Sequence, residues 1–130
     1  MRKARYIRVS TGNQKTARQE ARQSKDEILF TDIVSGSIPF EDREKGKDLM
    51  KAIQSGEIDY VSVSSIDRLG RNLYNILTTL EFFKENGIIL KVDNLGIESL
   101  VNGKENSAFK LIISVMANIA EMERESILER

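Results

Sequence analysis

Hydrophobic and polar positions along the first third of the chain change period several times, and each period predicts an element. Residues 4–9 and 27–33 are short runs rich in β-branched, aromatic and other apolar residues, which is typical of strands. The polar segment 11–25 between them has helical propensity, with Thr11 or Asn13 as possible caps. The chain therefore opens with a predicted strand, helix and strand.

The next stretch predicts a loop, a helix and a third strand. Residues 34–40 contain two serines, a glycine and the only proline, so we expect a long, mobile loop. The apolar spacing in residues 43–55 predicts a helix that Gly56 ends. A third strand is predicted at residues 60–65.

The clearest amphipathic helix of the first ninety residues follows, and Gly87 ends it. Its apolar side chains recur at helical spacing, at Leu73, Ile76, Leu77, Leu80 and Phe83. Residues 88–92 then form an apolar run broken only by Lys91, as in a buried parallel strand. Alternation of strands and helices predicts an α/β fold with a mostly parallel, four- or five-stranded sheet, helices on both faces, and sites at the carboxyl ends of the strands.

The last segment, from about residue 107 to residue 130, has helical apolar spacing and contains neither glycine nor proline. Such a helix is about 36 Å long, more than a small domain needs, so we expect it to mediate dimerisation. We expect one domain over residues 1–130. Because the sequence stops within this helix, we also expect a further domain after it.

Composition removes several classes of function. The 130 residues include no histidine and no cysteine, which excludes disulfides, thiolate zinc sites and Ser-His-Asp catalysis. Twenty basic and twenty acidic residues leave no net charge that would indicate a nucleic-acid partner. No apolar run is long enough for a bilayer and no signal-peptide pattern is present, so we expect a cytoplasmic protein without membrane contact.

The first strand carries a candidate nucleophile. Side chains alternate along a strand, so Tyr6, Arg8 and Ser10 share one face, while Ile7 and Val9 share the core-directed face. Folding does not require an arginine two residues before a serine at a strand end. Taken alone, however, Ser10 is better explained as a plain helix-capping or turn serine.

A second polar cluster, residues 67–72, lies between the third strand and the amphipathic helix. Arg68 and Arg71 are three residues apart and would share one side of a first helical turn, where the helix dipole favours a bound anion. Asp67 would cap the helix or orient an arginine. The alternative is a surface Asp-Arg pair. Arg43 follows the expected mobile loop, between acidic residues that could pair with it at the surface.

A nucleotide-binding loop is excluded. Gly96 and Gly103-Lys104 only superficially resemble one, because six residues separate the glycines and Glu105 stands where serine or threonine is needed. We therefore expect neither a nucleotide nor another cofactor. The acidic residues, including Asp59 and Asp93, also lack metal-site spacing, which argues against a metal-dependent nuclease or phosphatase.

Taken together, these blocks resemble the catalytic domain of serine recombinases of the resolvase/invertase type, in the family's order and over essentially the whole chain. The matching positions are Tyr6 to Thr11, Gln14, Gln19, Asp32 to Gly36, Arg43, Asp67 to Asn72, Glu123-Arg124 and Ile127 to Arg130. The resemblance implies a mostly parallel sheet, a long oligomerisation helix and a separate DNA-binding region after it.

The resemblance also implies roles for individual residues. Ser10 would attack a DNA phosphodiester, forming a 5′-phosphoserine bond and releasing a 3′-hydroxyl without ATP or metal. Arg8, Arg43, Arg68 and Arg71 would bind the phosphate, and Asp67 would position an arginine or handle a proton. The supporting residues would be Tyr6, Gln14, Gln19, Glu129 and Arg130. The implied partners are DNA and further copies of the chain, as a homodimer and as a homotetramer in the synaptic complex.

One hypothesis from another class remains. A non-catalytic α/β interaction or signalling domain that dimerises through its last helix would account for the same periodicities. This alternative would not explain the arginines expected near Ser10.

Overall fold

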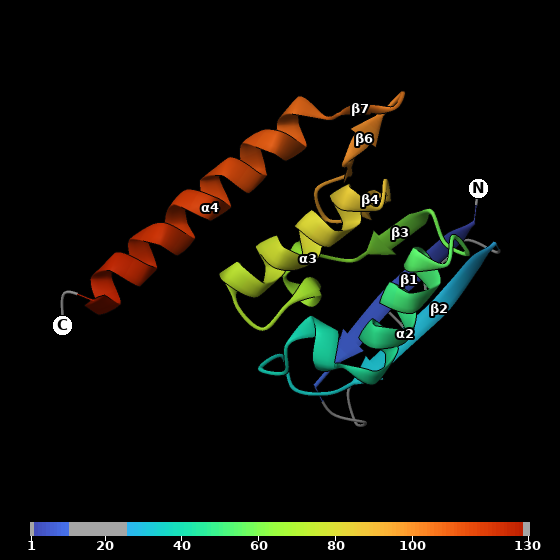
Figure 1. Ribbon diagram of the computed structural model, residues 1–130, viewed down its shortest axis with the longest axis horizontal. Coiled ribbons are helices and arrows are strands. Elements are labelled where there is room, and N and C mark those ends of the chain that lie inside the picture. The colour runs from blue at the N-terminus through green and yellow to red at the C-terminus, as the bar shows by residue number, and fades with distance from the viewer. Residues whose placement is uncertain (1, 11–25, 129–130) are drawn as a thin grey trace.

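A computed structural model of the chain describes residues 2–10 and 26–128, with side chains up to residue 123. Figure 1 shows an α/β arrangement with a long final helix. The strands are β1 (Lys3–Val9), β2 (Glu27–Ile33), β3 (Tyr60–Val63), β4 (Ile89–Val92), β5 (Ile97–Glu98), β6 (Leu100–Val101) and β7 (Lys104–Glu105). The helices are α2 (Glu44–Gln54), α3 (Leu73–Glu85) and α4 (Ser107–Leu128), with short 3-10 helices η1 (Phe40–Asp42) and η2 (Ile66–Leu69). The helix expected at residues 11–25 lies outside the described residues.

The main sheet has five strands in the order β2-β1-β3-β4-β5. All neighbours are parallel except β5, which runs antiparallel to β4. The prediction of an α/β fold with a mostly parallel sheet is therefore confirmed. Because β1, β2 and β3 are parallel neighbours, their carboxyl ends, and the segments that follow them, lie at one edge of the sheet.

The core forms on the sheet face that α2 and α3 cover. One hydrophobic cluster joins Tyr6 of β1, Leu49 of α2, Val61 and Val63 of β3, and Leu80 of α3. The expectation that only Ile7 and Val9 face a core was wrong, because Tyr6 and Ile7 are both 0% exposed. The strand β1 lies between two neighbours and is buried on both faces, as is usual for an interior parallel strand.

The segment before α3 differs from the expected first helical turn. Asp67 and Arg68 lie in η2, Gly70 is extended, and the helix begins only at Leu73. Asn72 is the N-cap, and its Oδ1 accepts the backbone N–H of Asn75 at 2.8 Å. Asp67 therefore does not cap α3, and Arg68 and Arg71 do not share a turn of that helix.

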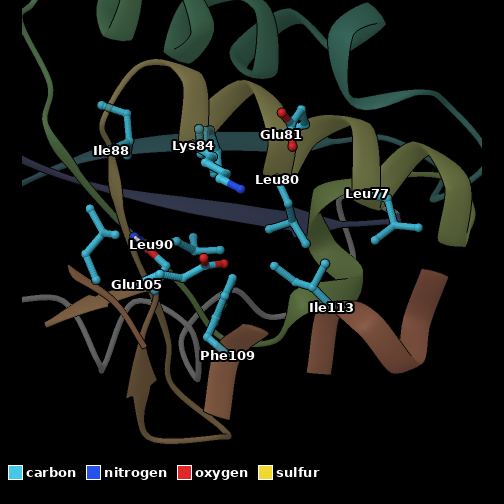
Figure 2. Close-up of a pocket in the computed structure, with 12 residues that line it drawn as sticks. Leu77, Leu80, Glu81, Lys84, Ile88, Leu90, Glu105, Phe109 and Ile113 are labelled. Carbon is cyan, nitrogen blue, oxygen red and sulfur yellow. Dashed lines mark hydrogen bonds between the residues drawn. The ribbon is translucent and has the colours of Figure 1, made fainter. Parts of the chain in front are cut away.

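The C-terminal helix α4 packs along α3 through only part of its surface. Phe109 and Ile113 point toward Leu80 across a small cavity of about 130 Å³ between the two helices (Figure 2). Large apolar side chains on the described part of α4 remain exposed at Leu111, Val115, Ile119 and Met122. No helix in the described part of the chain is long and apolar enough to cross a membrane.

Candidate functional site

The candidate site lies at the carboxyl edge of the sheet, where β1 and β3 end. Ser10 directly follows β1 and its side chain is exposed. The η2 segment, which carries Asp67 and Arg68, begins three residues after β3. The parallel register of β1 and β3 thus brings the two sequence motifs to the same edge, as the sequence predicted.

The half-buried Arg8 lies at the centre of this edge. Its Nη1 donates to the Val34 carbonyl at 3.2 Å, and a Cβ added to Gly36 would lie 3.4 Å from its guanidinium carbon. Arg68 Nη1 donates to the backbone carbonyl of Arg8 at 3.2 Å. The pKa of Arg8 is lowered, first by burial and then by the positive charges of Arg68 and Arg43. Three guanidinium groups therefore gather where a bound anion would relieve their repulsion.

Arg43 occupies a different position from the one expected. It is only 1% exposed and does not project from the surface of a loop. Its Nε donates to the Ile38 carbonyl at 3.0 Å, and its Nη1 donates to the Arg68 carbonyl at 2.6 Å and to the Tyr6 hydroxyl at 3.4 Å. The loop before η1 is thus bonded to η2 and β1. Among the described residues, Arg43 Nη2 and Arg68 Nε are buried without a hydrogen-bond partner.

Tyr6 and Asp32 form a buried, hydrogen-bonded pair that contacts Arg43. The Tyr6 hydroxyl donates to Asp32 Oδ2 at 2.8 Å, and Asp32 also accepts the backbone N–H groups of Lys45 and Gly46 at the start of α2. Burial raises the pKa of Tyr6, and Arg43 opposes that rise. Sequence reasoning assigned no role to Asp32. An acid near the carboxyl end of a predicted strand was the available signal.

Asp67 is exposed, and its carboxylate accepts a short hydrogen bond from the Ser65 hydroxyl. Its negative charge also acts on Arg8, because it raises the pKa of that guanidinium against the larger lowering effects. Asp67 caps no helix, and its carboxylate is hydrogen-bonded to Ser65.

Arg71 is exposed and lies on the Glu41 side of the site. The pKa of Glu41 is lowered, first by a hydrogen bond from Asn75 and also by the charges of Arg71 and Arg43. The backbone N–H of Arg71 donates to Asn75 Oδ1 at 3.0 Å. Sequence reasoning missed Asn75, although a polar residue between Asn72 and Ile76, at the start of an amphipathic helix, was a visible signal.

The remaining candidates, Gln14, Gln19, Glu129 and Arg130, lie outside the described residues. No group of three or more acidic side chains in the described ranges has the geometry to hold a metal ion. The described site thus consists of one exposed serine, four arginines and carboxylates that contact hydroxyl, amide or backbone groups.

Comparisons with known proteins agree with this architecture. Residues 3–130 match the family described as "Resolvase, N terminal domain". The chain is 35% identical over 128 residues to the Transposon Tn552 resolvase of Staphylococcus aureus, covering 96% of this chain and 61% of that protein. It is 32% identical over 129 residues to a DNA-invertase of Escherichia phage P1, covering 96% of this chain and 63% of that relative. The chain thus spans less than two thirds of the length of these relatives.

Solved structures give the same result for the fold. The N-terminal catalytic domain of TP901-1 integrase superimposes with a TM-score of 0.72 at 27% identity, and the match covers 98% of both chains. The chain therefore belongs to the resolvase N-terminal domain family.

Proposed function

We propose that this chain is the catalytic domain of a site-specific DNA recombinase in which Ser10 attacks a DNA phosphodiester. The observation that carries the proposal is the gathering of Arg8, Arg43 and Arg68 at the strand end that presents Ser10. Folding alone gives no reason to collect three like charges there. A phosphate between them and Ser10 supplies one.

The reaction moves negative charge onto the phosphate as the serine oxygen adds. The Ser10 hydroxyl gives up its proton as its oxygen bonds to phosphorus, the 3′-oxygen leaves and takes up one proton, and the 5′-phosphate stays on the serine, so no net proton is gained or lost. Fixed guanidinium groups stabilise that charge without reorganising. At an effective dielectric of about 20, one positive charge about 4 Å away contributes roughly 4 kcal/mol before desolvation costs. Reversal of the same step, with the 3′-hydroxyl of another strand, rejoins DNA without ATP.

The other predicted residues have supporting roles in this proposal. Arg71 approaches the phosphate from the Glu41 side, and Asp67 positions an arginine or accepts a proton. The Tyr6 hydroxyl accepts a hydrogen bond from Arg43 and so helps to position it. We assign Gln14, Gln19, Glu129 and Arg130 to the same site on the family resemblance alone.

The proposed partners are DNA and other copies of this chain. Leu111, Val115, Ile119 and Met122 recur every three or four residues on the exposed face of α4, as in helices that pair. We propose that this face, named the α4 stripe, forms a homodimer, and that two dimers form the homotetramer of the synaptic complex. We also propose a cytoplasmic location, which is compatible with a DNA substrate.

Trapping on suicide DNA tests this function. The protein is incubated with a pool of randomised duplexes that carry a nick, so that the cleaved strand diffuses away and rejoining stops. Denaturing electrophoresis then measures covalent protein–DNA adduct. Arg68→Gln should lower the rate of adduct formation by about 100-fold, because one preorganised donor to the transition state is lost.

A matched control removes the same charge elsewhere. Lys84→Gln, on an exposed position of α3, should leave the rate unchanged. Equal rates for wild type and Arg68→Gln would contradict the phosphate-binding role. Adduct formation by Ser10→Ala at the wild-type rate would contradict the proposed function itself and favour the non-catalytic hypothesis.

A further inference from the structure

Asn75 is a buried polar side chain that the reaction above does not use. It lies in the first turn of α3, next to the apolar Ile76 of the core. Its Oδ1 accepts the backbone N–H of Phe40 at 3.1 Å and that of Arg71 at 3.0 Å, and its Nδ2 donates to Glu41 Oε2 at 2.9 Å. One amide group therefore joins α3 to η1 and to the segment that carries Arg71.

Only an amide satisfies all three partners of Asn75. The two backbone N–H groups require an acceptor, and the Glu41 carboxylate requires a donor. A carboxylate in place of the amide would serve the first two partners and oppose the third. This chemistry also fixes the orientation of the amide, since the flipped orientation would place donors against donors.

The backbone around the Asn75 side chain is closely packed. A Cβ added to Gly70 would lie 2.7 Å from the Ile76 nitrogen and 2.8 Å from Asn75 Oδ1. The chain at Gly70 thus lies directly on the start of α3, and Arg71 follows it by one residue. On the other side of the amide, Phe40 begins η1, which leads into the buried Arg43.

We propose that Asn75 is a positioning residue that, with Glu41, holds the backbone of Arg71 and the η1 segment before Arg43 in register around the phosphate. This inference rests on the proposed function, because it assumes that both arginines act on one phosphate. The hydrogen bonds of Asn75 to Phe40, Arg71 and Glu41 do not depend on that assumption. Glu41 contributes in two ways, as the acceptor of the Asn75 amide and as a negative charge near Arg71 and Arg43.

Asn75→Asp tests the role of the Asn75 amide with almost no change in the size of the side chain. The introduced carboxylate keeps an acceptor for Phe40 and Arg71 but meets the Glu41 carboxylate without a donor between them. Two adjacent carboxylates share a proton at lower pH and repel once both are ionised, although Arg71 and Arg43 reduce that repulsion. We expect adduct formation about 10-fold slower than wild type at about pH 8, with part of the loss recovered at about pH 5 as the pair takes up a proton.

A second substitution should rescue the first. In Glu41→Gln/Asn75→Asp, the glutamine amide can donate to the introduced carboxylate, which still accepts the Phe40 and Arg71 N–H groups, so all three bonds are restored and only the bond between residues 41 and 75 reverses its donor and acceptor. We expect this double variant to react within about threefold of wild type at both pH values. The control Asn86→Asp makes the same change at the exposed far end of α3 and should react like wild type throughout.

Amide hydrogen exchange supplies a readout that needs no DNA. In Asn75→Ala, the Arg71 and Phe40 amides should exchange at least about 10-fold faster than in wild type, while amides of β1 and β3 keep their protection. Unchanged protection of both amides would overturn the inference. So would a Glu41→Gln/Asn75→Asp variant that stays folded and reacts no faster than Asn75→Asp.

Failure of the proposed function has a different signature. If wild type forms no adduct on any DNA, the recombinase proposal fails, and the proposed role of Asn75 in catalysis fails with it. Amide hydrogen exchange of Arg71 in Asn75→Ala then still decides whether Asn75 holds the backbone of Arg71 in place. If wild type reacts and Asn75→Asp matches it at every pH, only the positioning role fails.

Discussion

At the residue scale, Arg43 brings a full positive charge into the interior of the protein. A buried charge is costly unless its donors are satisfied. The Ile38 and Arg68 carbonyls and the Tyr6 hydroxyl satisfy Arg43 Nε and Nη1, and Tyr6 is in turn bonded to Asp32, whereas Arg43 Nη2 has no partner among the described residues. The sequence predicted Ser10, Arg8 and Arg68 at one edge because strand order determines that. It could not predict the burial of Arg43, whose partners come from three separate segments.

Removal of the Tyr6 hydroxyl tests this buried chain of bonds. Tyr6→Phe leaves the ring packing in place but removes a partner from Asp32 and from Arg43. We expect a loss of about 1–3 kcal/mol in the free energy of unfolding, measured by urea denaturation. Tyr74→Phe, which loses a hydroxyl at a residue that is 71% exposed, serves as the control and should change stability by less than about 0.5 kcal/mol. Equal stability of Tyr6→Phe and wild type would show that Arg43 does not depend on this hydroxyl.

At the element scale, the start of α3 decides where Arg68 and Arg71 lie. The apolar spacing correctly predicted the body of this helix and its end, but not its first turn. Asn72, not Asp67, is the N-cap, and Gly70 allows the preceding backbone to approach the helix. The Asn72 cap is a local bond to the Asn75 N–H, and Gly70 lies against Ile76 and Asn75, so neither effect belongs to the apolar periodicity from which the helix was predicted. The two-residue strands β5, β6 and β7 were missed because they are too short to show an alternating pattern.

A methyl group at Gly70 tests that close approach. Gly70→Ala places a Cβ against the Ile76 nitrogen and the Asn75 side chain, so α3 or η2 must shift. We expect the mutation to cost about 1–3 kcal/mol of stability, measured by thermal or urea unfolding. Gly36→Ala is the matched control, since its Cβ would make only an ordinary contact with Arg8. Similar stability for both variants would mean that the backbone at Gly70 has room that the structure does not show.

The α4 stripe is a second feature at this scale. Ile119→Glu introduces a charge into the proposed dimer face, and Asn118→Glu introduces the same charge at an adjacent exposed position. We expect Ile119→Glu to raise the dimer dissociation constant by about 10-fold or more in sedimentation experiments, which is about 1.4 kcal/mol. Asn118→Glu should change it much less. If both variants dimerise like wild type, the interface is not the α4 stripe.

At the scale of the whole molecule, a mostly parallel sheet collects at one edge residues that are far apart in the sequence. The alternation of strand and helix periods was enough to predict this arrangement, because right-handed connections between parallel strands leave few alternatives. Finer geometry came from polar side chains that bridge elements, such as Asp32 between β2 and α2 and Asn75 between α3 and η1. Each of them bonds two backbone N–H groups and one side chain from another segment, and a sequence pattern does not reveal these partners.

The pH dependence of global stability should reflect Glu41. Its folded-state pKa lies below the ordinary value of 4.5, so its contribution is present above that value and is lost as pH falls through the lower folded-state pKa. Urea unfolding from about pH 7 to about pH 3 should therefore show wild type more stable than Glu41→Gln at neutral pH, with the difference shrinking in acid. Glu85→Gln, an exposed position on α3 with the same change in charge, is the matched control. A constant difference across the range would contradict the coupling of Glu41 to Asn75 and Arg71.

The identity of the residue that bonds to DNA decides whether Ser10 is the nucleophile. Trypsin cleavage after Arg8 and Lys15 releases a peptide from Val9 to Lys15, in which Ser10 and Thr11 carry the only hydroxyl groups. Mass spectrometry of the trapped and nuclease-trimmed adduct should place a 5′-linked nucleotide on this peptide, and fragmentation should place it on Ser10. Attachment to Thr11, or to a serine of another peptide such as Ser35, would contradict the account.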